Sequence, residues 1–451
     1  MSSEIISVEE ASELKRLESR AVNASVWTII EYGSSMALRV ANSLILTRLL
    51  LPSYFGEITL VSTLIVGISL LSDIGLAPSV IQSARGDDPA FLNTAWTIQV
   101  MRGIGLWVIA LAISWPVAIF YHDPKLRFVL PVLAIYTILN GFNSTNLLTL
   151  SRHLGVRRLF AIDFSTQVIA LLVTVSWAYF WPSVWAIVGG NMASNLYRLC
   201  ISHSRLITPG IRNKFLWDKD SVHSIVHFGK WIFVGTAFFF FASQADRLIL
   251  GRLLSLSMLG IYGIAYALSD IPRSVLLALS SKVGYPFVSK IIHLPMSVFR
   301  SKFLQYRFYA LIIGAVVLTP MVVWGNEIIF HLYDHRYHEA AWMIPILAAG
   351  LWHTMLYSTT SMVLFSLGKT KYNAVGNAAY GVAMVTGIPI AFHFFGLPGA
   401  VVAVAAGDFP LYVVTQFGAT REGVKPLRQD LLMTFFFLAC LLLCFFLRRA
   451  L

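Results

Sequence analysis

The stretch NSLILTRLLLPSYFG, residues 42–56, recurs as DRLILGRLLSLSMLG, residues 246–260, at an offset of 204 positions. Eight of the fifteen positions are identical. Leucine-rich segments match by chance, so the informative identities are the polar and glycine positions. These are Arg48, Ser53 and Gly56, which recur as Arg252, Ser257 and Gly260. The sequence therefore predicts an internal repeat, in which two halves of the chain use the same stretch at the same place.

Composition assigns the chain to the membrane proteins. Of its 451 residues 57% are hydrophobic and only 12% are charged, with a mean hydropathy of +0.72. A soluble domain carries about a quarter charged residues. The net charge of +12 is spread between apolar segments, which favours orientation in a bilayer over nucleic-acid binding. The three cysteines frame no loop, so neither a disulfide nor a metal site is indicated.

Apolar segments long enough to cross a bilayer recur throughout the chain. The start, residues 1–20, is acidic and polar and does not read as a signal peptide. Twelve spans and a shorter thirteenth apolar segment are predicted, at 22–47, 55–83, 93–121, 127–150, 160–181, 183–203, 224–250, 258–290, 304–325, 340–367, 372–395, 397–418 and 429–447.

The distribution of basic residues predicts the orientation. With the N-terminus placed in the cytoplasm, nineteen Lys and Arg fall in inside loops and five in outside loops. The last segment breaks this rule, since a full crossing puts Arg448 and Arg449 outside. Either it crosses against the rule or it lies partly in the interface, and the sequence leaves both open.

The repeat then has an architectural meaning. Each copy closes one span and opens the next, and six spans separate the copies, so both halves have the same orientation. We expect an all-α polytopic fold of two parallel six-helix lobes around a central cavity, plus one extra C-terminal apolar helix. The predicted parts are a cytoplasmic segment 1–21, an N-lobe 22–203, a cytoplasmic linker 204–223, a C-lobe 224–418 and the extra helix 429–447.

Ionisable side chains inside the predicted spans are costly in lipid, so they are expected to face a wet cavity or a partner. Several form stripes at helical spacing. Local pairing is the alternative, and Asp270 with Arg273, three positions apart, can pair directly. The stripes are Glu31, Ser35, Arg39 and Asn42; Ser62, Ser69 and Asp73; Asp163, Gln167 and Thr174; Asn191, Asn195 and Arg198; and Tyr262, Tyr266, Asp270 and Arg273.

The segment HLYDHRYHEAAW, residues 331–342, concentrates histidine and acidic residues at spacings that a helix could align as the ligands of a metal ion. Its tyrosines and tryptophan fit an aromatic belt at the outer membrane surface, which is the simpler interpretation. No HExxH, GxSxG, GxxxxGK[ST] or paired CxxC signature occurs in the sequence. The common zinc, hydrolase and P-loop signatures are therefore absent.

The stretch EYGSSMALRVANSLILTRLLLPSYFGEITLVSTLIVGISLLSDIGLAPSVIQ, residues 31–82, resembles the bacterial oligosaccharide/polysaccharide flippase family. The later stretches RGDDPAFLNTAWTIQVMRG and GKWIFVGTAFFFFASQADRLILGRLL are also similar to that family. It belongs to the superfamily of multidrug, oligosaccharidyl-lipid and polysaccharide exporters. The resemblance implies two six-helix lobes around a V-shaped cavity. It also implies transfer of a lipid-linked saccharide from the cytoplasmic to the outer leaflet of the bacterial inner membrane.

An undecaprenyl-pyrophosphate saccharide has an anionic, hydrated head that a basic cavity could shield. Aromatic candidates for stacking on the sugars are Trp27, Tyr32, Tyr262 and Tyr266. No cofactor is expected, and a coupling proton or sodium ion is left open, with Asp408 as a further candidate. The candidates for the phosphate are Arg39, Arg102, Lys230 and Arg273, and those for cavity polarity or coupling are Glu31, Asp73, Asp163, Asp246 and Asp270.

Two other functions compete. A multidrug or cation-coupled exporter of the same superfamily needs an acidic cavity, whereas the ionisable residues here lean basic. A membrane polysaccharide polymerase or ligase needs a large extramembrane loop, which the short predicted outside loops do not provide. The expected partners are a lipid-linked oligosaccharide, membrane lipids and the polysaccharide polymerase or export machinery, and no nucleic acid.

Overall fold

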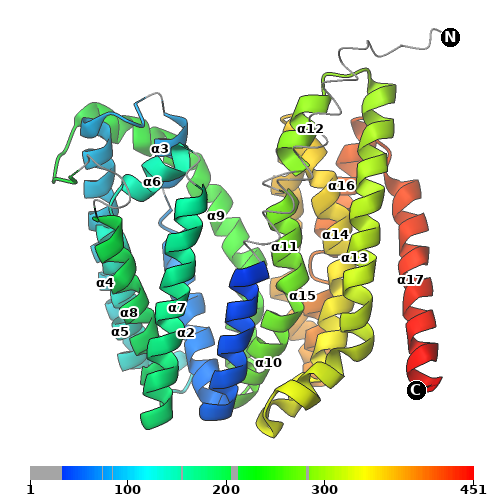
Figure 1. Ribbon diagram of the computed structural model, residues 1–451, viewed down its shortest axis with the longest axis horizontal. Coiled ribbons are helices and arrows are strands. Elements are labelled where there is room, and N and C mark those ends of the chain that lie inside the picture. The colour runs from blue at the N-terminus through cyan, green and yellow to red at the C-terminus, as the bar shows by residue number, and fades with distance from the viewer. Residues whose placement is uncertain are drawn as a thin grey trace. The chain divides into compact units, whose positions relative to one another are not determined.

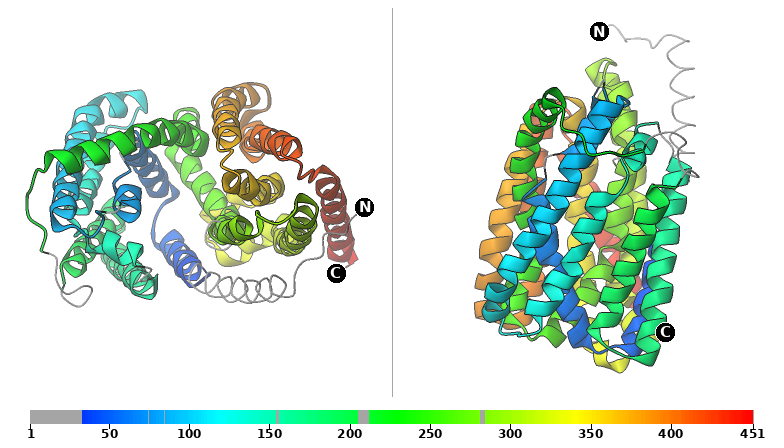
Figure 2. Two further views of the ribbon diagram at one scale, coloured as in Figure 1. Left: turned by 90° about the horizontal axis from the view of Figure 1, so that it is seen from above. Right: turned by 90° about the vertical axis from the view of Figure 1, so that its left-hand side faces the viewer.

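The computed structural model describes residues 33–73, 75–83, 85–153, 156–204, 212–280 and 284–450. Helices make up nearly all of these residues, and no strand occurs among them (Figure 1). Contacts group the chain into two compact units. One unit is Leu38–Gly263, and the other holds Ile264–Leu451 with the described residues 33–37. Within each unit the long helices lie side by side (Figure 2).

The first unit begins within a helix over residues 33–49. It continues with α2 (Pro52–Leu70), α3 (Leu76–Gln82), α4 (Pro89–Phe120), α5 (Leu126–Phe142), α6 (Asn146–Arg152), α7 (Val156–Phe180), α8 (Val184–Ser202), α9 (Lys219–Leu253) and the start of α10 (Leu256–Ser269).

The second unit begins within α10. It continues with α11 (Ile271–Leu279), α12 (Tyr285–Ile291), α13 (Met296–Leu332), the 3-10 helix η2 (His335–Ala340), α14 (Met343–Ser366), α15 (Lys371–Ala405), α16 (Phe409–Arg421) and α17 (Leu427–Ala450). The predicted lobe boundaries stay predictions, since these units are groupings by contact only.

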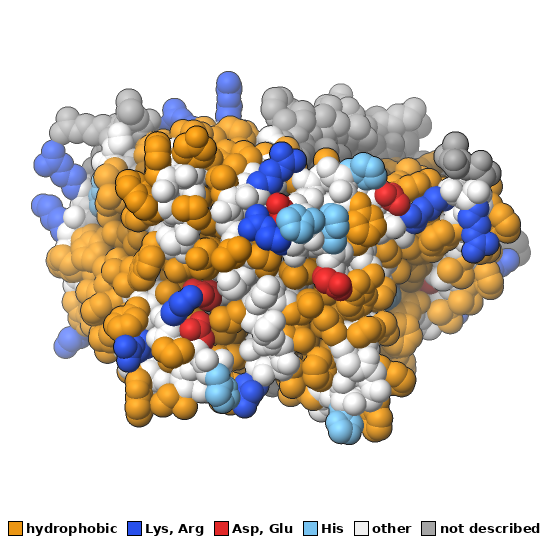
Figure 3. Space-filling model, turned by 90° about the horizontal axis from the view of Figure 1, so that it is seen from below, with side chains coloured by type: hydrophobic (Ala, Val, Ile, Leu, Met, Phe, Trp, Pro, Cys, Tyr) orange, Lys and Arg blue, Asp and Glu red, His pale blue; other side chains and the backbone are white. Residues whose placement is uncertain are grey.

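Each predicted span is mostly helical where its residues are described, with short breaks in several of them. In the described part of the chain seven helices are long and apolar enough to cross a membrane, or eight if the bent pair α5 and α6 counts as one span. Hydrophobic side chains cover much of the face in Figure 3, and charged side chains and histidines form small separate groups on it. The chain is a multi-pass membrane protein. The number of crossings stays a prediction.

Several predicted spans are broken where the sequence carries turn residues. After α2 the chain turns at Gly75, which has a φ of 62°, and the Asp73 carboxylate accepts a hydrogen bond of 2.9 Å from its backbone N–H. Between α5 and α6 the helix axis bends by 63°. At Gly396, with φ 62° and ψ −151°, the chain reverses. The opposed positions Tyr372 with Gly418, and Gly376 with Leu411, show that residues 371–395 and 397–421 form a helical hairpin.

Glycines let neighbouring helices approach closely in the first unit, as is usual in membranes. A Cβ added at Gly103 on α4 would lie 2.5 Å from the Thr137 carbonyl oxygen of α5. One added at Gly190 on α8 would lie 1.8 Å from the Thr174 hydroxyl of α7. Side chains larger than glycine are therefore excluded at both positions.

The two copies of the repeated stretch contact each other. A Cβ at Gly56 would lie 1.9 Å from the Leu256 carbonyl oxygen, and a Cβ at Gly260 would lie 2.0 Å from the Pro52 carbonyl oxygen. These two contacts are reciprocal, because each residue and its counterpart are separated by the repeat offset. Such reciprocal contacts are expected where two copies of a repeat meet at a two-fold axis. The contact supports the predicted two-lobe repeat, which itself stays a prediction.

The described end of the predicted linker lies along α4. The backbone N–H groups of Lys214, Leu216 and Asp218 donate to side chains of Asn93, Thr97 and Thr94, at 2.8, 3.0 and 3.1 Å. Asp218 then accepts from the Ser221 backbone N–H at the start of α9. The linker is thus tied to the first unit by its own backbone.

The last helix, α17, runs parallel to α13. Near one end Arg307 of α13 pairs with Asp430 at 2.6 Å, and near the other Glu327 pairs with Arg448 at 2.7 Å. The 23 residues Leu427–Arg449 are long and apolar enough to span. Arg448, which breaks the positive-inside pattern, therefore has its charge balanced by Glu327. This pairing favours a full crossing over an interfacial position.

Candidate functional site

The candidate site lies in the second unit around Arg273. Tyr266 and Asp270 lie seven and three residues before it, so they share its face across the junction of α10 and α11. The guanidinium Nη1 donates to the Tyr266 hydroxyl at 3.2 Å and lies 3.6 Å from an Asp270 oxygen. The Arg273 side chain is 16% exposed, and its buried Nε has no hydrogen-bond partner among the described residues.

Two tyrosines from later helices complete this cluster. Tyr357 on α14 hydrogen-bonds Arg273, and Tyr380 on α15 lies in electrostatic range of the same guanidinium. Both tyrosines are buried. The cluster of Arg273, Asp270 and these aromatic residues thus gathers a cation, a carboxylate and three hydroxyls from four helices.

A second polar group lies beside the Arg273 cluster. Asp408, the residue before α16, is 5% exposed. One of its carboxylate oxygens accepts from the Thr354 hydroxyl, and the other contacts Nε2 of His353. Tyr357 and Tyr380 lie in range of Asp408 as well as of Arg273. The two tyrosines therefore lie close to both charged groups.

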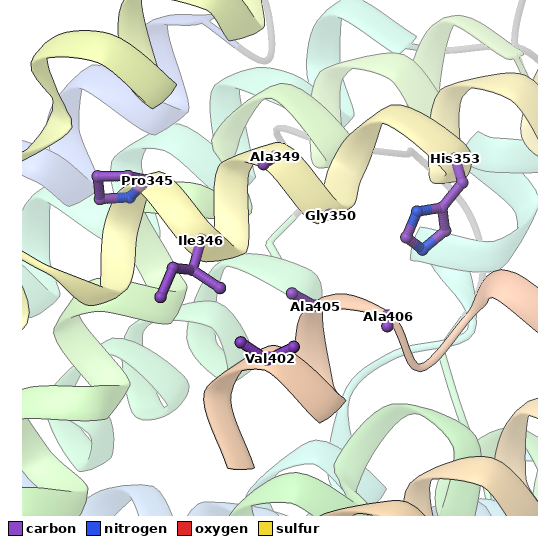
Figure 4. Close-up of a pocket in the computed structure, with 8 residues that line it drawn as sticks. All are labelled: Pro345, Ile346, Ala349, Gly350, His353, Val402, Ala405 and Ala406. Carbon is purple, nitrogen blue, oxygen red and sulfur yellow. The ribbon is translucent and has the colours of Figure 1, made fainter. Parts of the chain in front are cut away.

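His353 adjoins a pocket of about 420 Å³ between α14 and the C-terminal end of α15 (Figure 4). The Phe409 ring lies edge-on to the imidazole, with ring centroids 6.0 Å apart. The other residues that line the pocket are Pro345, Ile346, Ala349, Gly350, Val402, Ala405 and Ala406.

Of the predicted candidates, the structure brings together Asp270 and Arg273, with Tyr266. Tyr262, a predicted sugar-stacking residue, is fully buried and donates to Asp246 at 2.6 Å. Its ring therefore offers no face to a sugar in this structure. Asp246 is itself 1% exposed.

Other candidates of the first unit have structural partners. Asp163 on α7 forms an ion pair of 2.6 Å with Arg198 on α8, so it pairs with a residue of the neighbouring helix. Arg102 on α4 donates to the Ser69 carbonyl at 2.6 Å and to the Ser72 hydroxyl at 3.1 Å. It therefore satisfies carbonyl and hydroxyl groups where α2 ends.

Of the remaining candidates only Arg39 has a described side chain. Arg39 is exposed on the helix 33–49. Lys230 lies within α9, but its side chain is outside the described residues, as are Glu31 and the aromatic candidates Trp27 and Tyr32.

The histidine-rich segment near residue 335 is organised by pairs. His331 Nδ1 lies 2.9 Å from the Glu327 carbonyl oxygen, and the His338 ring lies edge-on to Phe330. Asp334 caps η2, and Arg336 holds the pKa of that carboxyl below its usual range. Across the residues that the structure describes, no group of three or more His, Cys, Asp or Glu could hold a metal ion.

A charged network lies at the loop before α4. Arg152 donates to the carbonyls of Val80, Ile81 and Ser83 and pairs with Asp87 at 3.0 Å. His153, followed by Arg152, holds the pKa of Asp87 below its usual value.

Arg85 likewise lowers the pKa of Asp88, with which it pairs at 2.7 Å, and it also reaches Asp218 at 3.4 Å. This second pairing joins the loop to the linker.

The sequence reasoning missed Tyr357, Tyr380, His353 and Thr354. The signal was available: the run HTMLYSTTS, residues 353–361, is unusually polar for a span. Seven of its residues are polar or aromatic-polar, and six of those seven are buried, all except His353.

Comparisons with known proteins identify the family and the fold. The family model described as polysaccharide biosynthesis protein matches residues 45–342, which is more than half of the chain. The lipopolysaccharide biosynthesis protein WzxC of Escherichia coli K12 is 22% identical over 73% of this chain and 66% of its own length. The succinoglycan biosynthesis transport protein ExoT of Rhizobium meliloti is 20% identical over 66% of this chain and 58% of its own. The chain thus spans less than two thirds of these relatives' lengths.

Two solved structures share the fold. The lipid II flippase MurJ in an inward closed conformation matches with a TM-score of 0.71 at 10% identity, over 93% of this chain and 92% of its own. An inward-facing multidrug resistance MATE family transporter of the MOP superfamily matches at 0.69 with 12% identity, over 87% and 96%.

The fold is therefore that of the MOP superfamily transporters: an all-helical, multi-pass membrane protein with buried charges inside its helix bundles. Within that class, the family match is decisive. The chain belongs to the polysaccharide biosynthesis protein family.

Proposed function

We propose that this chain flips a lipid-linked oligosaccharide, carried on undecaprenyl pyrophosphate, from the cytoplasmic to the outer leaflet of the bacterial inner membrane. It does so by alternating access, with its N-terminus in the cytoplasm. Family membership and relatives named for lipopolysaccharide and succinoglycan biosynthesis support this function. The protein is a transporter rather than an enzyme. Its partners are the lipid-linked saccharide, membrane lipids and the polymerase or export machinery.

The observation that carries the proposal is the Arg273 cluster. A guanidinium is suited to phosphate because it offers several donors in a fixed plane. The unpartnered buried Nε of Arg273 is a donor still available to an anion. The tyrosine hydroxyls of residues 266, 357 and 380 can bond to sugar hydroxyls or phosphate oxygens. A cation among tyrosines thus matches a substrate with an anionic head attached to sugars.

The membrane potential supplies a direction for such a substrate. With the inside negative, outward movement of each negative charge is favoured by about 2.3 kcal/mol per 100 mV. An anionic head therefore moves outward without ATP.

A strain lacking the gene tests the proposal. We expect lipid-linked oligosaccharide to accumulate on the cytoplasmic leaflet while surface polysaccharide is lost, and a plasmid copy to reverse both. Arg273→Gln should fail to reverse them at normal membrane abundance. The matched control is Arg336→Gln, which removes a guanidinium that pairs with Asp334 at the start of η2. Normal complementation by Arg273→Gln would refute the assignment of the phosphate site.

The similarity in fold to the MATE transporter favours a second function, multidrug export. The same strain distinguishes the two. Normal surface polysaccharide with increased drug sensitivity would support the exporter. Loss of polysaccharide without any accumulated intermediate would instead indicate a step in synthesis.

A further inference from the structure

We propose that His353 and Asp408 form a proton-binding site beside the Arg273 cluster, and that uptake of a proton there strengthens binding of the anionic head. This inference rests on the proposed function for its ligand, but the proton site stands on its own contacts. The site is assembled from two elements, α14 and the residue that precedes α16.

The first step is the state of the carboxylate. Asp408 is 5% exposed, and both of its oxygens are engaged by side chains of α14. A buried carboxylate needs a hydrogen-bond donor or a counter-charge on each oxygen. Thr354 supplies a hydroxyl donor, and His353 supplies a charge when its imidazole is protonated. A neutral imidazole with its hydrogen on Nε2 can already donate to the carboxylate, and a second proton, taken up at Nδ1, adds the counter-charge.

The second step is access. Asp408 is enclosed, whereas the His353 imidazole adjoins the pocket between α14 and α15 (Figure 4). The small side chains of Ala349, Ala405 and Ala406 leave room there. The pocket lining includes no charged group other than this histidine. The imidazole therefore offers a proton a route from the pocket to the carboxylate.

The third step is the choice of ion. The atoms that could bind an ion at this place are the two carboxylate oxygens of Asp408, one hydroxyl and one imidazole nitrogen. Hard metal cations prefer a shell of oxygen ligands, and an imidazole is a poor member of such a shell. Within the described residues no cluster suited to a metal ion includes this site. The donor set fits a proton better than sodium.

The fourth step is the link to Arg273. Tyr357 of α14 and Tyr380 of α15 lie in electrostatic range of both Asp408 and Arg273 of α11. From α13, Arg307 is engaged instead with Asp430, as is Tyr412 of α16.

The charges then decide the direction of coupling. Asp270 already balances Arg273, so Asp408 adds an uncompensated negative charge whenever His353 is neutral. Protonation of His353 removes that excess, with no bond changed other than the new N–H. An anionic phosphate near Arg273 is then repelled less. Proton uptake and binding of the anion therefore favour each other, as linkage requires.

Infrared difference spectroscopy on the purified full-length protein tests the site without any ligand. Between about pH 5 and about pH 8 we expect bands of imidazole protonation together with a shift of a carboxylate band. His353→Gln should remove one histidine's contribution, and Asp408→Asn should remove the carboxylate shift. The control Ser358→Ala, a hydroxyl on α14 bonded only to the Met355 carbonyl, should change neither.

Spectra of His353→Gln that match the wild type would overturn the proton site. A response to sodium against choline at fixed pH, with no response to pH, would also overturn it and indicate a sodium site.

Coupling is measured with farnesyl diphosphate, a soluble lipid diphosphate, by calorimetry over the same pH range. The probe's own ionisation contributes equally to wild type and Asp408→Asn. We expect wild-type affinity to fall several-fold more steeply with rising pH than that of the variant. Equal slopes would refute the coupling. A proton signal with no accumulation of lipid-linked oligosaccharide in the deletion strain would refute the proposed function and leave the proton site standing.

Discussion

The ion pair between Arg307 and Asp430 makes a quantitative test of how α17 is held. Both side chains are 1% exposed. Asp430→Ala leaves a guanidinium buried without its counter-charge, a change that typically costs about 3–5 kcal/mol. Arg307 keeps three other acceptors, the Thr359 hydroxyl, the Gln429 amide oxygen and the Leu356 carbonyl. These still solvate the charge, so we expect a loss near the lower end, about 3 kcal/mol.

The same two helices supply the control. Glu327 and Arg448, at the opposite end of α13 and α17, are 39% and 31% exposed. Glu327→Ala removes a partner from a partly solvated charge, so it should cost less than about 1 kcal/mol. Comparing the two variants separates loss of a buried pair from general loosening of α17.

The assay is thermal unfolding of the purified full-length protein in detergent, followed as loss of monodisperse protein. The double variant Arg307→Met with Asp430→Leu should recover most of the stability, because neither charge is then stranded. A loss in Asp430→Ala no larger than in Glu327→Ala would refute the reasoning, as would a double variant as unstable as the single one.

Three further predictions concern backbone and loops. Gly260→Ala should lower the unfolding temperature sharply because its Cβ would meet the Pro52 carbonyl, while Gly105→Ala, with open space around it, should have little effect. Gly396→Ala should destabilise the hairpin of α15, since a positive φ strains any residue with a side chain. The yield of monodisperse protein on size-exclusion chromatography measures the loss. A yield equal to that of the wild type would contradict the prediction. Asp87→Asn should reduce stability at pH 7, and the loss should shrink as pH falls below about 3.9, the ordinary pKa of an aspartate. The reason is that a carboxylate with a lowered pKa stabilises above its ordinary pKa and loses this effect as pH falls through its folded value. A stability difference that does not change with pH would exclude this role.

Hydropathy alone predicted where the helices lie, since each apolar run buries its backbone polar groups only by becoming helical in lipid. It did not predict where they break. The turn at Gly75 depends on a local bond from Asp73, and the reversal at Gly396 depends on one backbone angle. Both are decided by one or two residues inside otherwise continuous apolar sequence.

The candidate site was predicted in part. Asp270 and Arg273 share a helical face, so their proximity follows from spacing. Tyr357 and Tyr380 come from other helices, and an aromatic residue in a span is more often a packing residue, so spacing gave no reason to choose them. Partners distant in sequence explain the other differences. Asp163 finds Arg198 across a helix pair, and counting loop charges could not reveal that Glu327 balances Arg448.

The contact between Gly56 and Gly260 bears on the origin of the chain. Because the contact is reciprocal, a chain of half the length that carried the stretch once could make it with a second copy of itself. Such a contact is the isologous interface of a symmetric homodimer. Joining two such genes end to end would keep the interface and free each copy to diverge everywhere except where backbones meet. Gly56 and Gly260 would then remain from the interface of an ancestral dimer. A larger residue at either position would clash with the backbone of the other copy.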